Sequence, residues 1–475
     1  MNKYSKIVLT AAILVLVATG LAAWSITDTY FGNKQGGYEA RSFSMGAAGT
    51  FNDLRPFGIA ANPANLTLLD QRLAFQGGAL ITRNEDNRHI PLYNSFDNYI
   101  DDAVYASNIN FFDDYAIAGM GALQFGAFKM GLGIYRKPLL DFGGYYHEEI
   151  RNNRNTDNDG YPEKLAINKI ENTGNLMQNA GVLSFGFDLL DCAQMNFGAE
   201  LSLLQGKQEY SKTIRWSQWA IDTFADAVNN ASKVLPNYEI SSDTELDGMQ
   251  LKAGTAIRFN KRFGLAATYT PKATLDRTGS IKEHREAYYN ADAIDNTLTI
   301  DEDYILPAEI RLGILYQPQN IMRTWFNLDA EYVQWSQISS HYEDQFNLYA
   351  GVEHWVENRF PLRLGFQAQN GYLREVETDG SVIAKRILTP MLTAGSSFQL
   401  TSFLTIDLGF GYSWREYEAI DLFGDAYYND RIYSGSSTYA LWPNSHITLI
   451  NRGWENPDKV RENNISLNTG ITFTW

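Results

Sequence analysis

Cysteine, long apolar runs and positive charge are all scarce in this chain. Cys192 is the one cysteine among 475 residues, which excludes an intrachain disulfide framework and a zinc site made of cysteines. The apolar run at residues 7–18 is too short for a membrane helix, which needs about 20 residues. With 39 Lys and Arg against 55 Asp and Glu, the net charge is −16, so no basic surface for nucleic acid is expected.

Catalytic signatures are missing as well. The chain contains no Gly-x-Ser-x-Gly, no His-Glu-x-x-His and no phosphate-binding P-loop, and it has six histidines. Sequence spacing leaves open a catalytic triad assembled across distant strands. The sequence nevertheless favours a protein that is not an enzyme and that has no cofactor.

The first 23 residues have the pattern of a secretory signal. Lys3 and Lys6 precede the apolar run 7–18, and small residues at 18, 20, 22 and 23 offer cleavage sites. No cysteine lies near them, so a lipoprotein anchor is not expected. The sequence therefore predicts export, with residues 1–23 removed.

The last eleven residues predict a membrane-facing strand. Ile465, Leu467, Ile471, Phe473 and Trp475 share one parity, while the other parity is small and polar. Because side chains alternate between the two faces of a strand, one face is apolar and the other polar. Eleven tilted residues rise roughly 27 Å, about the height of the apolar band of an outer-membrane barrel. An amphipathic edge strand of a soluble protein is the alternative.

Thirteen further runs resemble this strand, and the links between them alternate in length. Short links at residues 125–127, 189–194, 260–262, 317–321, 357–359 and 401–402 separate longer ones, the longest at 84–114, 138–177, 209–247, 276–304 and 417–463. Short periplasmic turns and long external loops are typical of transmembrane barrels. The sequence predicts an all-β fold, a 14-stranded antiparallel transmembrane β-barrel over residues 71–475. The predicted strands are 72–83, 115–124, 128–137, 178–188, 195–208, 248–259, 263–275, 305–316, 322–335, 346–356, 360–372, 389–400, 403–416 and 464–475.

Charges and aromatic residues support this arrangement. Most strand charges fall on the parity opposite the apolar one, and an Arg or Lys facing lipid would cost about 2–4 kcal/mol at the midplane. Outward aromatic residues group near the two expected membrane surfaces. Those expected near the outer surface are Tyr269, Tyr332, Tyr372, Tyr412 and Trp414.

Residues 24–70 lack strand patterning and predict a compact hatch, or plug, in the barrel lumen. Residues 41–46 and the motif Asn62-Pro63-Ala64 resemble the N-terminal hatch of the FadL-type long-chain fatty acid transporters. Residues 306–313, 327–336 and 362–365 resemble strands of the same superfamily, in the same order along the chain. Asn65 departs from the glycine that often follows Asn-Pro-Ala in that family.

The resemblance implies passive import of a hydrophobic small molecule such as a long-chain fatty acid. The external loops would capture the molecule, the lumen would bind it, and it would then be released through the hatch or the wall. The superfamily also includes barrels that bind protein partners in secretion or assembly, which is the alternative function. Outer-membrane lipid and lipopolysaccharide are the expected surroundings, and the barrel is expected to be a monomer in the bacterial outer membrane.

Three groups of residues are candidates for this function. Arginines expected to face the lumen could hold a carboxylate bidentately, although pairing with lumen carboxylates is the alternative. A helical pattern at 216–228 predicts an external apolar groove, or else a face packed on neighbouring loops. Gly and Pro in the third strand predict a bend that could form a gate. The residues are Arg258, Arg311, Arg323 and Arg363; Trp216, Trp219 and Phe224; and Gly131, Gly133 and Pro138.

Residues 155–163 resemble part of a calcium loop. Asn155, Asp157, Asp159 and Glu163 are oxygen-bearing residues around Gly160. The twelfth position is Ala166 instead of Glu, so the EF-hand pattern is incomplete. A solvated polar loop is the alternative to Ca²⁺ binding.

Overall fold

The computed structural model describes most of the chain. Described are residues 32–34, 37–52, 54–94, 96, 98–151, 164–189, 193–227, 237–260, 262–287, 293–319, 323–339, 342–357, 359–372, 375–376, 382–383, 387–419, 438–441, 444–450 and 458–475. The expected signal segment 1–23 and the calcium loop 155–163 lie outside them. No helix in the described part of the chain is long and apolar enough to cross a membrane.

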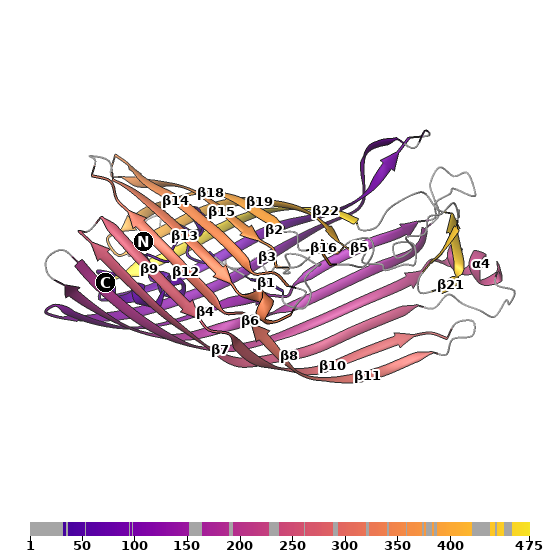
Figure 1. Cartoon of the computed structure of the whole chain (residues 1–475), viewed down its shortest axis with the longest axis horizontal. Coiled ribbons are helices and arrows are strands. Elements are labelled where there is room, and N and C mark those ends of the chain that lie inside the picture. Colours follow the sequence, from indigo (N-terminus) through magenta and orange to yellow (C-terminus); the bar gives the residue numbers. More distant parts are fainter. Residues whose placement is uncertain are drawn as a thin grey trace, which may run out of the picture.

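The wall is a closed antiparallel barrel of 14 strands, as the sequence predicts (Figure 1). The last strand pairs with the first from Ala74 opposite Thr474 to His89 opposite Lys459, which closes the cylinder. Three wall strands are interrupted and carry two labels each: β4 and β5, β9 and β10, β11 and β12. The elements of the wall are β2 (Leu73–Tyr93), β3 (Tyr99–Phe125), β4 (Phe128–Asp141), β5 (Gly144–Arg151), β6 (Lys164–Leu189), β7 (Ala193–Trp216), β8 (Tyr238–Phe259), β9 (Phe263–Thr270), β10 (Ala273–Arg285), β11 (Ile294–Leu306), β12 (Glu309–Tyr316), β13 (Thr324–Val333), β14 (Gln345–Val356), β15 (Phe360–Asn370), β18 (Leu388–Thr401), β19 (Leu404–Ala419) and β22 (Asp458–Thr474).

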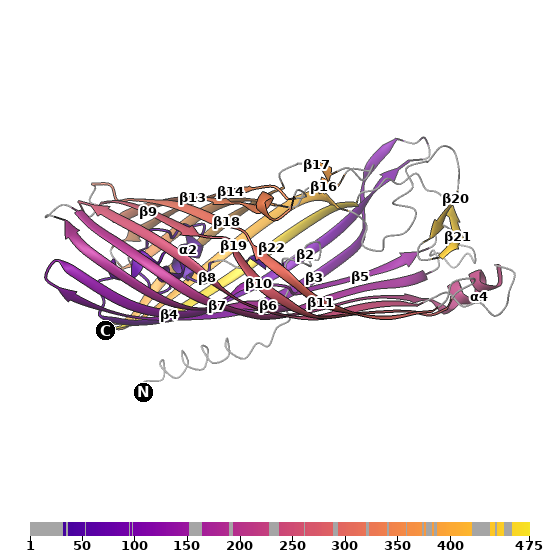
Figure 2. The same ribbon diagram turned by 60° about the horizontal axis from the view of Figure 1, so that its bottom comes forward.

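The strands continue far beyond the lipid-facing band. On the outer face, Leu203 lies opposite Met249, and the next outward pair is Gln205 opposite Asp247. This change from apolar to polar side chains marks the outer edge of the apolar band. Beyond it β6, β7, β8, β10 and β11 form a tall extension that reaches away from the barrel end where the C-terminus lies (Figures 1 and 2).

The prediction of long external loops at 84–114, 138–177, 209–247 and 276–304 is therefore largely wrong. The loop predicted at 417–463 is wrong at its two ends, which belong to strands. β2 and β3 pair up to Tyr93 opposite Tyr99, and β10 and β11 pair up to Arg285 opposite Ile294. Above the membrane both faces of a strand are polar or mixed. The alternation that identified the strands stops there, while backbone pairing continues.

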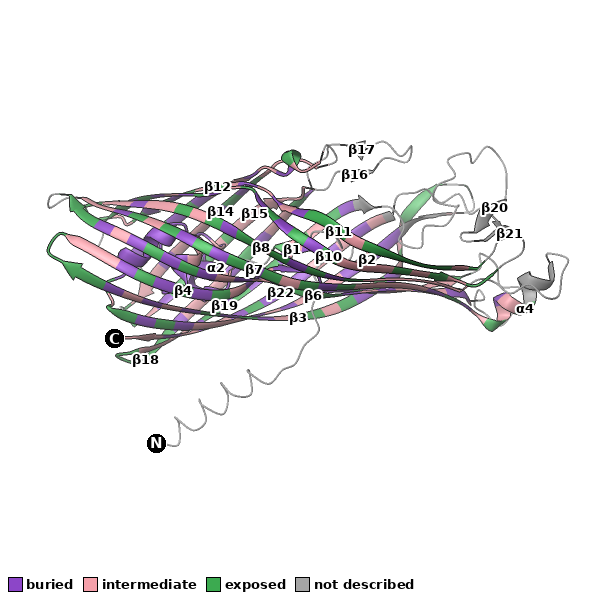
Figure 3. Ribbon diagram, turned by 90° about the horizontal axis from the view of Figure 1, so that it is seen from below, coloured by how far each residue is buried: buried purple, intermediate pink, exposed green. Residues whose placement is uncertain are grey.

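The remaining elements are short. Inside the barrel lie β1 (Asn33–Lys34), α2 (Ala40–Ser44), α3 (Gly58–Ala61) and the 3-10 helix η1 (Pro63–Thr67). Figure 3 shows α2 between the walls, with buried residues along it. Outside the ladder of the wall are α4 (Gln218–Ala227), the 3-10 helix η3 (Trp335–Gln337), and two small hairpins, β16 (Glu375–Val376) with β17 (Val382–Ile383) and β20 (Thr438–Leu441) with β21 (Asn444–Ile450).

Residues 38–69, here called the inner segment, pack against glycines of the wall. A Cβ atom at Gly131 would lie 1.7 Å from Leu66 Cδ2, and one at Gly133 would lie 2.8 Å from Ile59 Cδ1. Both apolar side chains are fully buried. The predicted gate residues Gly131 and Gly133 thus lie in a regularly paired part of β4, where the missing side chains make room for the inner segment.

We expect Gly131→Val to lower the stability of the folded barrel, because the added methyl groups collide with Leu66 in a filled core. Overpacking of this kind costs about 1–3 kcal/mol. The measurement is urea unfolding in lipid vesicles, followed by tryptophan fluorescence. Gly181→Val in β6 is the matched control, since nothing lies within 4 Å of a Cβ atom there. Equal unfolding midpoints for the two variants would contradict the packing role.

Candidate ligand passage

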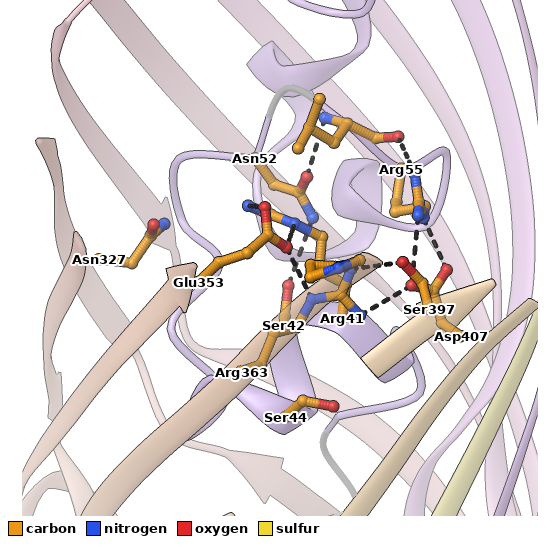
Figure 4. Close-up of polar contacts among 12 residues, drawn as sticks. Arg41, Ser42, Ser44, Asn52, Arg55, Asn327, Glu353, Arg363, Ser397 and Asp407 are labelled. Carbon is orange, nitrogen blue, oxygen red and sulfur yellow. Dashed lines mark hydrogen bonds and ion pairs between the residues drawn. The ribbon is translucent and has the colours of Figure 1, made fainter. Parts of the chain in front are cut away.

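The inner segment is fastened to one side of the barrel by a chain of buried ion pairs (Figure 4). Arg41 Nε lies 2.9 Å from Glu353 Oε2, and Arg363 Nε lies 2.6 Å from the same oxygen. Arg363 Nη1 then reaches Asp407 Oδ1 at 2.8 Å, and Arg55 Nε reaches Asp407 Oδ2 at 2.7 Å. Two arginines of the inner segment are thereby joined through a wall arginine and two wall carboxylates.

The motif Asn62-Pro63-Ala64 is a second attachment point. Asn62 Oδ1 accepts from the Ala64 amide at 2.9 Å and caps η1, and Pro63 occupies the first turn of that helix. Asn62 Nδ2 donates to the backbone oxygens of Thr50 (3.0 Å) and Thr255 (3.1 Å). The Asn62 side chain therefore joins the inner segment to β8.

The four candidate arginines do not form one pocket. Arg363 is 2% exposed and its guanidinium is shared between Glu353 and Asp407, so it cannot receive an external carboxylate. Arg311 is paired with Asp329 at 2.9 Å and lies over the ring of Tyr349. Arg363 and Arg311 thus both pair with carboxylates of the lumen, which was the alternative to binding a ligand.

The other two candidate arginines contact aromatic rings. The Arg258 guanidinium carbon lies 5.4 Å from the centroid of the Phe51 ring. Arg323 precedes β13 near a periplasmic turn and is exposed, with its guanidinium carbon 4.6 Å from the centroid of the Trp355 ring. The expectation that Arg323 lies in a dry lumen pocket is therefore wrong, because its side chain is exposed just before β13 begins at Thr324.

The expected external groove is not formed by the tryptophans named for it. Trp216 is the last residue of β7 instead of a helical residue, and it is 7% exposed. It packs with Leu165, Ile214 and Ala220, and Trp219 lies against the same cluster. Both rings thus fix α4 to the tip of the extension; the side chain of Phe224 lies outside the described part of the structure.

An apolar belt lines the inner wall above the inner segment. It is a continuous cluster of inward side chains from β4 to η3, and Trp335 stacks on Tyr372 with ring centroids 3.8 Å apart. Tyr372, expected to face lipid, instead belongs to this interior cluster. The members of the belt are Leu140, Phe142, Leu176, Leu204, Leu246, Ala273, Leu275, Tyr304, Leu306, Val333 and Trp335, with Leu139, Ile338, Tyr342 and Tyr372 against them.

A cation adjoins this belt. Lys34 of β1 lies directly opposite Leu140 of the belt in the β1–β4 pair, and 48% of its side-chain surface is exposed. Although desolvation acts in the opposite direction, the carboxylates of Glu309 and Glu331 raise the pKa of Lys34 above its usual value. Lys34 is therefore charged at neutral pH, with Glu309 and Glu331 as its partners. No sequence pattern singled out this lysine.

The backbone ladder of the wall is interrupted beside the belt. β3 and β4 pair only from Phe125 opposite Phe128 to Ile117 opposite Arg136. Beyond that point β4 changes its register with β6 between Pro138 and Leu140, and it pairs with β1 where β3 would otherwise continue. The gap between residues 111–116 of β3 and 137–143 is here called the wall gap. Pro138, predicted as a bend, lies at its start.

Side chains close the wall gap at its outer end. Asn108 exchanges two hydrogen bonds with the backbone of His147 in β5, at 2.9 and 3.3 Å. Asn110 Nδ2 donates to the Tyr145 carbonyl at 3.2 Å. The gap is therefore bounded by a backbone ladder below and by asparagine contacts above. Pro138, predicted as a bend, was the sequence signal for it.

Arg363→Met is expected to destabilise the barrel by about 3–5 kcal/mol, because it leaves Glu353 and Asp407 short of a buried counter-ion. Unfolding by urea, with the midpoint and slope both recorded, measures this. Arg359→Met is the control: its pair with Glu357 has exposed side chains, 77% and 71%, and is worth at most about 1 kcal/mol. A loss for Arg363→Met no larger than for the control would show that the ion-pair chain does not hold the barrel together.

Comparisons with known proteins agree on the architecture. No protein-family model and no curated protein sequence matches the chain. A solved FadL homologue of Pseudomonas aeruginosa matches with a TM-score of 0.59 at 13% identity, covering 93% of this chain and 99% of that one. The Pseudomonas putida toluene transporter TodX matches with 0.56 at 13% identity, and the Ralstonia pickettii toluene transporter TbuX with 0.52 at 15% identity. Each of these two comparisons also covers 93% of this chain and 99% of the other. The chain therefore has the fold of the FadL-type outer-membrane barrels.

Proposed function

We propose that this barrel carries hydrophobic small molecules passively across the bacterial outer membrane. The observation that carries the proposal is the position of the apolar belt, which reaches the wall gap through Leu140 of β4 and Phe142 just after that strand. A ligand desolvated against the belt lies next to an interruption of the wall at the outer edge of the apolar band. The solved channels with this fold include transporters named for toluene, which is consistent with such a ligand.

Release through the wall is the route that the geometry favours. The exit below the belt is filled by the inner segment, whose arginines are held by buried carboxylates. Displacing them would leave charges unpaired, which costs several kcal/mol per ion. β1 is held to β4 by only two residue pairs, so its movement would break few backbone contacts. Its ion pairs to Glu309 and Glu331 come from Lys34, which is half-exposed and can be hydrated when β1 moves. A ligand moving sideways through the wall gap therefore meets the smaller barrier.

A long-chain fatty acid is the expected ligand class, because Lys34 places a cation at the edge of the belt. The acyl chain would contact the belt and the carboxylate would meet the ammonium group. Charge-assisted hydrogen bonds of this kind contribute about 1.5–3 kcal/mol. Glu309 and Glu331 compete for the same ammonium group, so the carboxylate must displace one of them.

A role in binding protein partners is the second candidate. In the extension, the described residues of β11 pair with β10 alone, which leaves the other edge of a 13-residue strand without a ladder. An exposed strand edge can accept a strand from another chain. A purified barrel without lipid that carries a stoichiometric protein would favour this candidate over transport.

Leu246→Asn is expected to weaken binding of a hydrocarbon or fatty acid, because it places an amide without partners in the belt. Burial of an unpaired amide costs about 1–3 kcal/mol, or roughly tenfold in affinity. Equilibrium binding of radiolabelled oleate and toluene to the barrel in detergent measures it. Leu298→Asn in β11 is the matched control, since Leu298 is 62% exposed and lies outside the belt. Unchanged affinity for Leu246→Asn would place the ligand elsewhere.

Lys34→Met distinguishes a carboxylate ligand from a hydrocarbon ligand. We expect the affinity for oleate to fall about tenfold while that for toluene changes by less than about twofold, because only oleate has a carboxylate. Lys34→Arg keeps the charge and should retain oleate binding. An equal loss for both ligands would mean that Lys34 acts on the structure of β1 instead of on the carboxylate.

A further inference from the structure

A groove lies on the lipid-facing side of β2, β3 and β4, close to the barrel end where the C-terminus lies. Its volume is about 340 Å³, and ligand pockets begin at about 300 Å³. The floor contains Gly119 and Gly121, two successive outward positions of β3. Its sides are formed by exposed apolar side chains that face lipid. They are Leu73, Phe75, Leu132, Ile134 and Trp475.

The register between the strands gives the groove its shape. Two rows of outward residues cross the three strands, and each row has a glycine between two large apolar residues. The rows are Phe75, Gly119 and Ile134, and Leu73, Gly121 and Leu132. A Cβ atom at Gly119 would lie 3.7 Å from Phe75 Cδ2, which is an ordinary contact distance, so the space above the floor is open. The groove therefore runs along β3 over two successive rows.

The same part of the wall also lacks side chains on its inward face. Gly131 and Gly133 of β4 face the lumen, where Leu66 and Ile59 of the inner segment fill the space. Protein thus completes the packing on the inside, whereas the outside is left to the membrane. A chain that lies in the groove touches protein on three sides, so it gains more dispersion contacts than a chain lying on a flat wall.

A cation lies at one end of the groove. Arg72 directly precedes Leu73 and is exposed. Its backbone oxygen accepts a hydrogen bond from the Ala122 amide at 2.9 Å, and it would lie 3.7 Å from a Cβ atom at Gly121. These two distances fix Arg72 beside the floor, at the start of β2. Arginine binds phosphate oxygens through charge-assisted hydrogen bonds, often two at a time.

We propose that the groove binds one glycerophospholipid of the periplasmic leaflet. One acyl chain would lie over the two glycines, between Phe75 and Ile134, and the phosphate would meet Arg72. The site matches both parts of such a lipid, since its sides are apolar and the charge at its rim is positive. Leu73 and Trp475 exchange backbone hydrogen bonds at the barrel end with the short turns, which places the groove in the periplasmic half of the wall.

A second copy of the barrel fits this face less well. Specific protein interfaces bury at least about 1,000 Å² in total. A groove two rows long holds one extended chain, and the outward curvature of a barrel keeps two walls from burying that area. The groove faces lipid, whereas the apolar belt faces the lumen, so the inference holds whatever molecule the barrel carries.

The test is native mass spectrometry of the mature barrel, stripped of lipid in detergent and titrated with phosphatidylglycerol. We expect one phospholipid to bind each chain more tightly than any further lipid. Gly119→Leu fills the groove and should weaken this binding by about tenfold or more. Gly181→Leu is the matched control and should stay within about twofold, since Gly181 is an outward glycine of β6 with nothing within 4 Å of a Cβ atom. Heat-modifiability on gels confirms that both variants are folded.

A second variant separates the phosphate from the acyl chain. Arg72→Gln should weaken binding of phosphatidylglycerol about tenfold, while binding of diacylglycerol, which has no phosphate, changes by less than about twofold. Arg359→Gln, in the turn between β14 and β15, is the control and should change neither affinity by more than about twofold.

Unchanged phospholipid binding by Gly119→Leu would overturn the proposal, as would a dimer that forms through this face without lipid. A parallel loss of oleate binding in Gly119→Leu would also overturn it, because the groove would then belong to the route of the transported ligand. Failure of the transport proposal gives a different result: the unmodified barrel would bind neither oleate nor toluene and would still bind the phospholipid.

Discussion

Backbone pairing inside the bilayer is the constraint on which the rest of this molecule depends. A strand in lipid has no water to satisfy its amides and carbonyls, so every wall strand needs a neighbour on both sides. The barrel meets this need by closing β22 on β2. Between β3 and β4 the ladder stops at the outer edge of the apolar band, and β1 pairs there with β4 instead.

The interior depends on a second constraint, that buried charges must be paired. The inner segment contributes Arg41 and Arg55, and the wall contributes Glu353, Arg363 and Asp407. These residues form ion pairs of alternating charge, which hold the inner segment against β14, β15 and β19. The opposite side is fixed by apolar contacts and by Asn62. This division leaves the belt and the wall gap as the part of the lumen where few charges are committed.

Much of the fold could be predicted because lipid imposes a strict pattern on a strand. All 14 predicted strands coincide with strands of the wall, and the predicted inward placement of most strand charges agrees with the burial of Glu353, Arg363 and Asp407. The extension was not predicted, because its strands face water on one side and polar or mixed residues on the other. Arg323 and Tyr372 were misplaced for a related reason, since both lie near strand ends where parity no longer decides the face.

The sequence by itself determined which strand residues face lipid and how many strands close the barrel. Those properties follow from alternation along single strands, which is local. Tertiary structure alone decided that Lys34 lies beside the belt and that Asn108 and Asn110 bridge the wall. These contacts depend on the register between neighbouring strands and on the interruption of the ladder at Pro138. Register is a property of strand pairs that no single strand encodes.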